Sequence, residues 1–353
     1  MIDFQFNYPI LNDQRDQFIR LIEQSLRQPD LLELPPDAGR DEHHQAAAEW
    51  LSRKGHAIPK ERVVLCCGGH HAVMVTLLAL ELRGKKVVVD PLTYSNFKTQ
   101  AASLGIELLP CEGDAEGMLP DALATLARSH RPAAVYLMPT VHNPLGTVMP
   151  ENRRREICAV ADRHDLSILD DDAYAFLEAD PPPSFAALAP DRAFSVSSFS
   201  KSFAPAMKLA FLTFPEGSAE NLISIIKVTT SGTSVLLAEA AARLIRSGDM
   251  ARLLEAKRAE ATERQKIAHA VLNGVSVRAH PTAFHLWIDL PPHQSAASVA
   301  ERLEQDEVLV SSSDNFRATP YVQANGLRVA MGSARSHDIL RQGLEKVRRH
   351  LRP

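Results

Sequence analysis

Two segments of the chain place side chains that could serve carbonyl chemistry, one by reacting and one by hydrogen bonding, directly after short apolar runs. In SSFSKSFAPAMKLAFLTFP, at 197–215, Lys201 follows such a run in a turn rich in Ser and Phe. An amine attacks a carbonyl only after losing its proton, and partial burial or nearby cations lower the pKa of a lysine. Most lysines after a strand are surface residues, so a functional role for Lys201 has to be argued from the other motifs that accompany it. In YLMPTVHNPLGTVMP, at 136–150, Asn143 begins a tight turn and can donate a side-chain hydrogen bond.

A third segment, LSILDDDAYAFL at 166–177, ends an apolar run in three carboxylates, with Tyr174 three residues after Asp171. Side chains alternate along a strand, so neighbouring acids cannot all face the same way. An acid that faces inward needs a cationic partner, because an unpaired buried carboxylate is costly. Metal binding is the competing interpretation, but no His or Glu at ligand spacing accompanies these acids, and no metal site is expected.

The surrounding sequence indicates an α/β fold that would bring these segments together. Short apolar runs alternate with amphipathic helical stretches between 61 and 215, which is typical of a mostly parallel sheet with helices on both faces. Ligands bind such sheets at the carboxyl ends of the strands, where the reactive side chains would lie. The seven predicted strands are 62–67, 86–90, 106–111, 133–138, 166–171, 193–198 and 209–214.

The pattern changes after this region. Residues 217–272 are mainly helical, and beyond Gly274 short predicted strands alternate with helices, which indicates a smaller α+β domain. Its predicted strands are 275–280, 283–290, 308–313 and 327–332, with helices at 295–307 and 338–351. We therefore expect an N-terminal arm and connector at 1–34, a large domain at 35–240 and a small domain at 241–353.

Composition excludes several classes of partner. The 353 residues carry a net charge of −4 and no dense basic run, so nucleic acid is not an expected partner. No apolar stretch approaches the roughly 18 residues of a membrane span, and the N-terminus lacks a signal-peptide core, so no membrane association is expected. The cysteines fit neither a disulfide framework nor a metal site and suggest a reducing cytoplasm; they are Cys66, Cys67, Cys111 and Cys158.

The ordered motifs N-P-x-G, D-x-x-Y and S-x-S-K resemble those of the fold type I pyridoxal-phosphate aminotransferases of class I/II. The similarity runs from about Asp30 to the C-terminus. It implies a pyridoxal 5'-phosphate cofactor, an amino acid and a 2-oxo acid as substrates, and a homodimer. By this resemblance Lys201 would form the internal aldimine and carry a proton between the substrate Cα and the cofactor. Asp171 would pair with the protonated pyridine nitrogen, which keeps the ring an electron sink.

The same resemblance implies roles for the other motif residues. Asn143 and Tyr174 would hydrogen-bond the cofactor's phenolic oxygen, with Asn143 also beside the substrate. Arg328, in NGLRVAMG, would grip the substrate α-carboxylate through a bidentate fork. Tyr94 would stack on the pyridine ring. The phosphate would lie at a helix start and be held by a set of five residues, Gly69, His70, Ser198, Ser200 and Lys208.

Several positions depart from the family pattern. Lys208 stands where an arginine is usual, Leu34 where many relatives have a tyrosine, Asn7 where a glycine is usual, and His70 where a small or amide residue is commoner. His285 falls near a substrate-facing segment, although a lone strand histidine is more often structural. These changes concern the substrate and phosphate surroundings.

We therefore expect an aminotransferase acting on an α-amino acid. The alternative within the same fold is other chemistry on an amino acid: decarboxylation, β- or γ-elimination or replacement, or cyclisation. A third hypothesis is a ligand-sensing module like the aminotransferase-like domain of certain bacterial transcription regulators. It is less favoured because only about thirty residues precede the connector, which leaves no room there for a DNA-binding domain.

Overall fold

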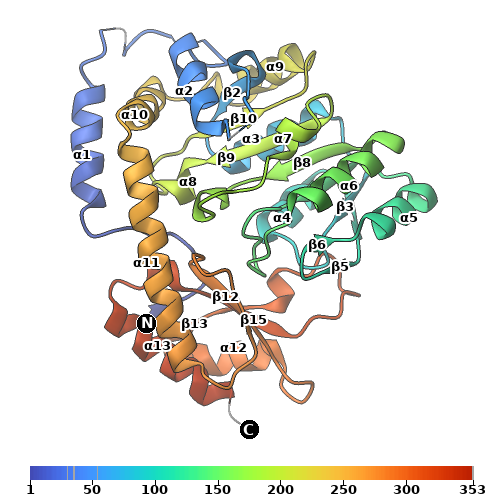
Figure 1. Ribbon diagram of the computed structural model, residues 1–353, viewed down its shortest axis with the longest axis vertical. Coiled ribbons are helices and arrows are strands. Elements are labelled where there is room, and N and C mark those ends of the chain that lie inside the picture. Colours follow the sequence, from blue (N-terminus) through green and yellow to red (C-terminus); the bar gives the residue numbers. More distant parts are fainter. Residues whose placement is uncertain (30, 35, 54, 352–353) are drawn as a thin grey trace.

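A seven-stranded sheet forms the centre of the larger part of the computed structural model, which describes residues 1–29, 31–34, 36–53 and 55–351 (Figure 1). The order is β2-β10-β9-β8-β7-β3-β4, and β10 is antiparallel to both of its neighbours while the other strands share one direction. All seven predicted strands are confirmed: β2 (Val63–Cys66), β3 (Lys86–Val89), β4 (Glu107–Pro110), β7 (Ala134–Leu137), β8 (Ser167–Asp171), β9 (Ala193–Ser198) and β10 (Ala210–Thr213).

The two faces of this sheet bury separate apolar clusters. In β7, Tyr136 belongs to the cluster under α3 and α4, whereas Val135 and Leu137 belong to the cluster under α5, α6 and α7. This alternation is what a strand covered on both faces requires. The helices of these layers are α3 (Gly69–Ala79), α4 (Ser95–Ser103), α5 (Pro120–His130), α6 (Glu151–Arg163), α7 (Phe185–Leu188) and α9 (Ala219–Thr230).

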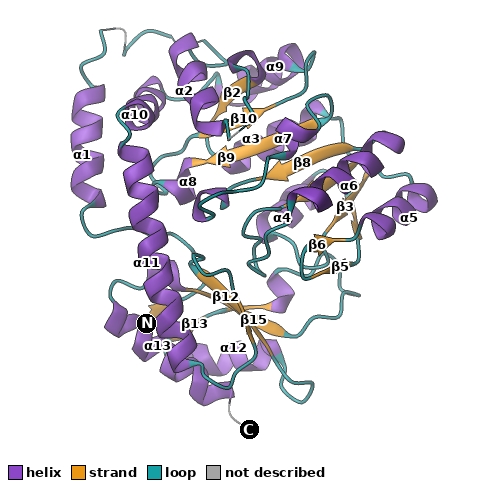
Figure 2. Cartoon of the chain, in the orientation of Figure 1, coloured by secondary structure: helices purple, strands orange, loops and turns teal. Residues whose placement is uncertain are grey.

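The smaller part of the molecule contains a four-stranded sheet in the order β11-β12-β15-β14. The long helix α11 (Asp249–Val271) runs from the large sheet to this smaller one (Figure 2). The helix α10 (Val235–Arg246), which precedes α11, packs in the apolar cluster of the large sheet. The remaining elements of the smaller part are β11 (Val277–Arg278), β12 (His285–Asp289), α12 (Ala296–Gln305), β14 (Ser311–Ser312), β15 (Gly326–Ala330) and α13 (His337–Leu351).

The prediction of one strand at 308–313 is wrong. The segment divides into β13 (Val308–Leu309), which pairs in parallel with β1 (Ile2–Asp3), and β14, which joins the smaller sheet. The partner of β13 lies about three hundred residues earlier in the chain, so no local sequence pattern predicts this pairing. Residues 1–3 thereby become part of the small-sheet region.

The N-terminal region continues with α1 (Gln14–Ser25), which matches the predicted amphipathic helix, and α2 (Asp41–Leu51), which was not predicted. The hairpin β5 (Gly113–Asp114) and β6 (Gly117–Met118) was also missed. Asp30, where the family resemblance begins, and residue 35, where we expected the large domain to begin, lie outside the described residues. Of the helices in the described ranges, none combines the length and apolarity needed to cross a bilayer.

Candidate active site

A cavity at the carboxyl ends of the central strands gathers most of the predicted site residues. Tyr8 of the N-terminal segment and Tyr136 of β7 also line it. Asn143 and Arg328 are not in the lining; they contact each other, with Arg328 Nη1 donating to Asn143 Oδ1 at 3.1 Å. The predicted residues in the lining are Gly69, His70, Tyr94, Asp171, Tyr174, Ser198, Ser200, Lys201 and Lys208.

Lys201 lies on the short helix α8 (Phe199–Ser202), which begins where β9 ends. Its Nζ donates to the carbonyl oxygen of Asn7 at 3.1 Å and lies 3.6 Å from the ring centre of Tyr8. Burial, reinforced by the charge of Arg328, lowers the pKa of Lys201 to about 7. Its amine can therefore be neutral near physiological pH, as a nucleophile or a proton acceptor must be.

Two buried side chains hold the backbone around Lys201. Lys257 of α11 donates from Nζ to the carbonyl oxygens of Phe203 at 2.7 Å and Lys201 at 3.4 Å. Gln14 of α1 donates to the same Phe203 oxygen at 2.5 Å. Burial lowers the pKa of Lys257 to about 7 as well, but Lys257 does not line the cavity. Its contacts are those of a residue that fixes the turn after Lys201.

Asp171, the last residue of β8, places its carboxylate in the cavity. Oδ2 accepts a hydrogen bond from the Tyr136 hydroxyl at 2.8 Å, and Oδ1 accepts one from the backbone N–H of Ala173 at 3.3 Å. Burial raises the pKa of Asp171 to about 6, and the bond from Tyr136 is the largest effect in the opposite direction. The carboxylate is thus ionised at neutral pH and can hold a proton on a basic nitrogen.

The start of α3 forms one end of the cavity. A Cβ on Gly69 would lie 3.2 Å from Ser198 Cβ, so a larger residue would crowd the approach of the two elements. The hydroxyl of Ser198 accepts from the N–H of Ser200 at 3.3 Å. In the described part of the chain, no hydrogen bond or ion pair engages the ammonium of Lys208. A helix N-terminus, serine hydroxyls and a free cation form a site suited to a phosphate group.

His70 and Tyr94 meet beside that end of the cavity. His70 Nε2 lies 2.9 Å from the Tyr94 hydroxyl, and Asn96 Nδ2 lies 2.9 Å from the same ring nitrogen. Burial lowers the pKa of His70, and the charges of Lys201 and Lys208 lower it further. His70 is therefore uncharged at neutral pH and adds hydrogen-bonding capacity rather than charge.

Asn7 connects three of the predicted residues. Its Nδ2 donates to the Tyr174 hydroxyl at 3.4 Å and lies 3.3 Å from His285 Nδ1. His285 Nε2 lies 3.0 Å from the carbonyl oxygen of His142, which can only accept, so Nε2 carries the proton and Nδ1 accepts from Asn7. Burial lowers the pKa of His285 to about 3, which keeps the ring neutral. His285 thus orients Asn7, whose own carbonyl oxygen accepts from Lys201.

Arg328 is held in a fixed orientation on β15. Nη2 donates to the hydroxyl of Ser311 at 3.1 Å and to the carbonyl oxygen of Gln5, and the guanidinium lies 5.0 Å from the ring centre of Phe316. Its Nε is buried without a hydrogen-bond partner among the described residues. The side chain is therefore preorganised, with the hydrogen-bonding capacity of Nε unused.

Sequence reasoning missed Tyr8, Tyr136 and the contact between Asn7 and Lys201. A signal existed for Tyr136, because it alternates with Val135 and Leu137 and must face the opposite side of the sheet. None existed for Tyr8, since its approach to Lys201 joins parts of the chain nearly two hundred residues apart.

The family model described as "Aminotransferase class I and II" matches residues 1–347. The chain belongs to this family. The cofactor of the family is pyridoxal phosphate, and the cavity fits it: a lysine amine with a lowered pKa, a buried carboxylate and an anion site converge there. The motif resemblance and the expected fold are thereby confirmed.

The curated proteins similar to this chain include two groups, HTH-type transcriptional regulators and aminotransferases. The HTH-type transcriptional regulator YdeF of Bacillus subtilis is 28% identical over 306 residues, covering 87% of this chain and 66% of the relative. The bovine mitochondrial kynurenine/alpha-aminoadipate aminotransferase is 23% identical, covering 73% of this chain and 68% of the relative. For four HTH-type regulators in the first group, the matches span 53 to 66% of their lengths.

Solved structures of aminotransferases share the fold. An archaeal alanine:glyoxylate aminotransferase superimposes with a TM-score of 0.90 at 20% identity, covering 99% of this chain and 90% of that one. The alpha-aminoadipate aminotransferase LysN of Thermus thermophilus, complexed with N-(5'-phosphopyridoxyl)-L-leucine, has a TM-score of 0.89 at 20% identity, covering 99% and 92%.

Proposed function

We propose that the chain is a pyridoxal-phosphate-dependent aminotransferase that moves the amino group of an α-amino acid to a 2-oxo acid. The observation that carries the proposal is the pair formed by Lys201 and Asp171 in one cavity. The pKa of Lys201 is lowered to about 7, and Asp171 is ionised at neutral pH. A proton-accepting amine and a carboxylate suited to a protonated ring nitrogen are what transamination needs.

When bound, the cofactor supplies an electron sink for the charge that develops at the substrate Cα. Lys201 would bind the cofactor through Nζ, take the Cα proton from the amino acid and deliver it to the cofactor carbon. Asp171 would hold the proton on the ring nitrogen. Arg328 would orient the α-carboxylate of both substrates in turn, since one site must serve both.

The remaining predicted residues would bind and orient. Tyr174 and Asn143 would donate hydrogen bonds to the phenolic oxygen, with Asn143 also beside the substrate through its contact with Arg328. Tyr94 would stack on the ring. The phosphate would be surrounded by Gly69, His70, Ser198, Ser200 and Lys208. Gly69 and His70 begin α3, and the other three line the same cavity, which supports this proposal.

A homodimer in a reducing cytoplasm belongs to the same proposal. Leu32 and Leu34 are 99% and 88% exposed, a position that favours contact with a second copy. The four cysteines are all free. We also retain the proposed boundaries at 34/35 and 240/241. The large and the small sheet have separate apolar clusters, and the cluster of the large sheet includes residues of α10 and of the first half of α11.

The deciding experiment follows the visible spectrum of the purified protein while amino acids are added one at a time. A suitable amino acid alone should bleach the cofactor band and release one equivalent of keto acid, and a 2-oxo acid should restore the band. Carbon dioxide, ammonia or a cyclised product with an unbleached band would assign the alternative chemistry. Borohydride should fix the cofactor on the peptide that contains Lys201; label on Lys208 or Lys227 would refute the site.

A ligand-sensing role is the second candidate, and the HTH-type regulators among the relatives favour it. Both candidates use the cofactor, so its presence does not separate them. The product does: a sensing module would bind an amino acid and shift the band without releasing keto acid, even after prolonged incubation. Turnover with a second substrate would assign the catalytic role.

A further inference from the structure

The Tyr136 hydroxyl lies directly against the carboxylate of Asp171. In the parallel pair β7 and β8, Tyr136 is in register with Leu169, so its side chain lies on the same face as Leu169 and as Asp171 two residues further on. The phenol side chain is long enough to span the diagonal from Tyr136 to Asp171 on the neighbouring strand, and its hydroxyl donates to Asp171 Oδ2 at 2.8 Å.

The position of this hydroxyl is tightly constrained. Tyr136 is 1% exposed, and its ring stacks on Phe97 of α4 with 3.6 Å between ring centres and 7° between planes. Burial and the neighbouring Asp171 raise the pKa of Tyr136 well above its usual value. The hydroxyl therefore keeps its single proton at any working pH, and that proton is committed to Asp171.

The other groups near Asp171 act less uniformly. Lys201 approaches from α8 and favours the ionised carboxylate, but its own pKa is about 7, so its charge is incomplete at neutral pH. Asp172 opposes ionisation, and the phenols of Tyr94 and Tyr174 are neutral. Of the groups that favour the carboxylate, the Tyr136 hydroxyl has the largest effect, and its effect is independent of pH.

We propose that Tyr136 is a positioning residue that keeps the Asp171 carboxylate ionised and aimed at the cofactor's ring nitrogen. The inference rests on the proposed role of Asp171. A hydroxyl held by the Phe97 stack supplies one oxygen of the carboxylate with a fixed donor. The N–H of Ala173 fixes the other oxygen, so the plane of the carboxylate is set before the cofactor binds.

The test compares two ligands of the apoprotein. One is pyridoxal phosphate and the other is its analogue with the ring nitrogen replaced by carbon, which cannot pair with Asp171. The ratio of their dissociation constants measures that pairing alone. Wild-type protein should prefer the natural cofactor. In Tyr136→Phe the preference should fall by about twofold at pH 7 and by about tenfold at pH 5, because loss of a charge-assisted hydrogen bond raises the pKa of Asp171 by about one unit from about 6.

Controls separate this effect from packing. Phe97→Leu disturbs the ring stack without removing the hydroxyl, so it should weaken both ligands in parallel and leave the ratio unchanged. In an Asp171→Asn background, adding Tyr136→Phe should not change the ratio further. Site-specific 3-fluorotyrosine at position 136, a stronger donor of nearly equal size, should raise the preference and serves if the Phe variant does not fold.

The possible failures are distinguishable. Wild-type protein without any preference for the natural cofactor would overturn the proposed role of Asp171. A wild-type preference that survives in Tyr136→Phe, or that Phe97→Leu reduces equally, would overturn the role of Tyr136 while leaving Asp171 in place. An unchanged preference with 3-fluorotyrosine would overturn it as well.

Discussion

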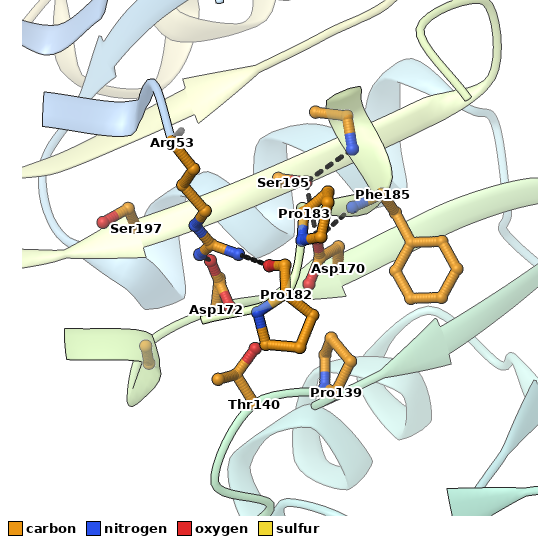
Figure 3. A network of polar contacts seen from close by, with 12 residues as sticks. Arg53, Pro139, Thr140, Asp170, Asp172, Pro182, Pro183, Phe185, Ser195 and Ser197 are labelled. Carbon is orange, nitrogen blue, oxygen red and sulfur yellow. Dashed lines mark hydrogen bonds and ion pairs between the residues drawn. The ribbon is translucent and has the colours of Figure 1, made fainter. Parts of the chain in front are cut away.

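The two faces of β8 use the same residue type for different purposes. Asp171 faces the cavity, where its hydrogen-bond donors are the hydroxyl of Tyr136 and one backbone N–H. Asp170, which precedes Asp171 in β8, and Asp172, which directly follows the strand, alternate with it and are expected on the opposite face. Both belong to a polar network around Arg53 and Ser195 (Figure 3). There Asp172 forms an ion pair with Arg53, and Asp170 Oδ2 accepts from the Ser195 hydroxyl at 2.8 Å and from the N–H of Phe185 at 3.0 Å.

Arginines hold the structure around the second face. Arg53 bridges Asp172 and the carbonyl oxygen of Pro182. The fully buried Arg154 of α6 donates to backbone carbonyl oxygens and one hydroxyl, at Met149, Pro183, Pro139 and Thr140. Donors on this face are therefore occupied by structural contacts. The comparison teaches that the carboxylate that lines an open cavity, rather than the two that are enclosed by structural contacts, is the one available for chemistry.

The largest difference between the faces should appear in the reaction rate. Asp171→Asn should retain cofactor but lose on the order of 10² or more in kcat, about 3 kcal/mol of transition-state stabilisation, because an amide does not stabilise a protonated ring nitrogen. Asp172→Asn should keep most of the activity of each molecule that binds cofactor. Single-turnover rates of the two variants check this, and a larger loss in Asp172→Asn would reverse the assignment of the faces.

Stability should show the opposite order. Arg53→Met leaves the buried carboxylate of Asp172 unpaired and should lower the free energy of unfolding by about 3 kcal/mol. The rate of the half-reaction per bound cofactor should change little. Urea denaturation measures the loss. Adding Asp172→Asn to Arg53→Met removes the unpaired charge and should recover part of the stability; no recovery would mean that the bond to Pro182 is the important contact.

The smallest effect concerns pH. Burial raises the pKa of Asp170 above its ordinary value of 3.8, so the folded state keeps a proton that the unfolded state releases. The contribution of this group is complete at low pH and is lost as pH rises from about 4 through the folded pKa. The side chain in Asp170→Asn cannot titrate. Between pH 4.5 and 7.5 the free energy of unfolding of this variant should therefore fall by about 1 kcal/mol less than that of wild type. Parallel curves of unfolding free energy against pH would contradict the raised pKa of Asp170.

Features encoded locally were predictable, and those made by distant contacts were not. The apolar runs, the acids at the end of β8 and Lys201 after β9 identify themselves through composition and alternation. The pairing of β1 with β13 and the contact of Asn7 with Lys201 join residues far apart in the chain, where no periodicity operates. The roles assigned to Asn143 and Arg328 remain predictions, although their mutual hydrogen bond is a contact that the motifs did not suggest.

The first fourteen residues are fastened at both ends. β1 pairs with β13, and Gln14 bonds to the turn after Lys201. Between them, Asn7 accepts a hydrogen bond from Lys201, and Tyr8 lines the cavity. The segment is therefore held at fixed points on both sides of Asn7 and Tyr8. A displacement of β1 is expected to move these two residues and thereby the amine of Lys201. An affinity tag, a surface anchor or a fused domain at residue 1 is accordingly an intervention at the reaction centre.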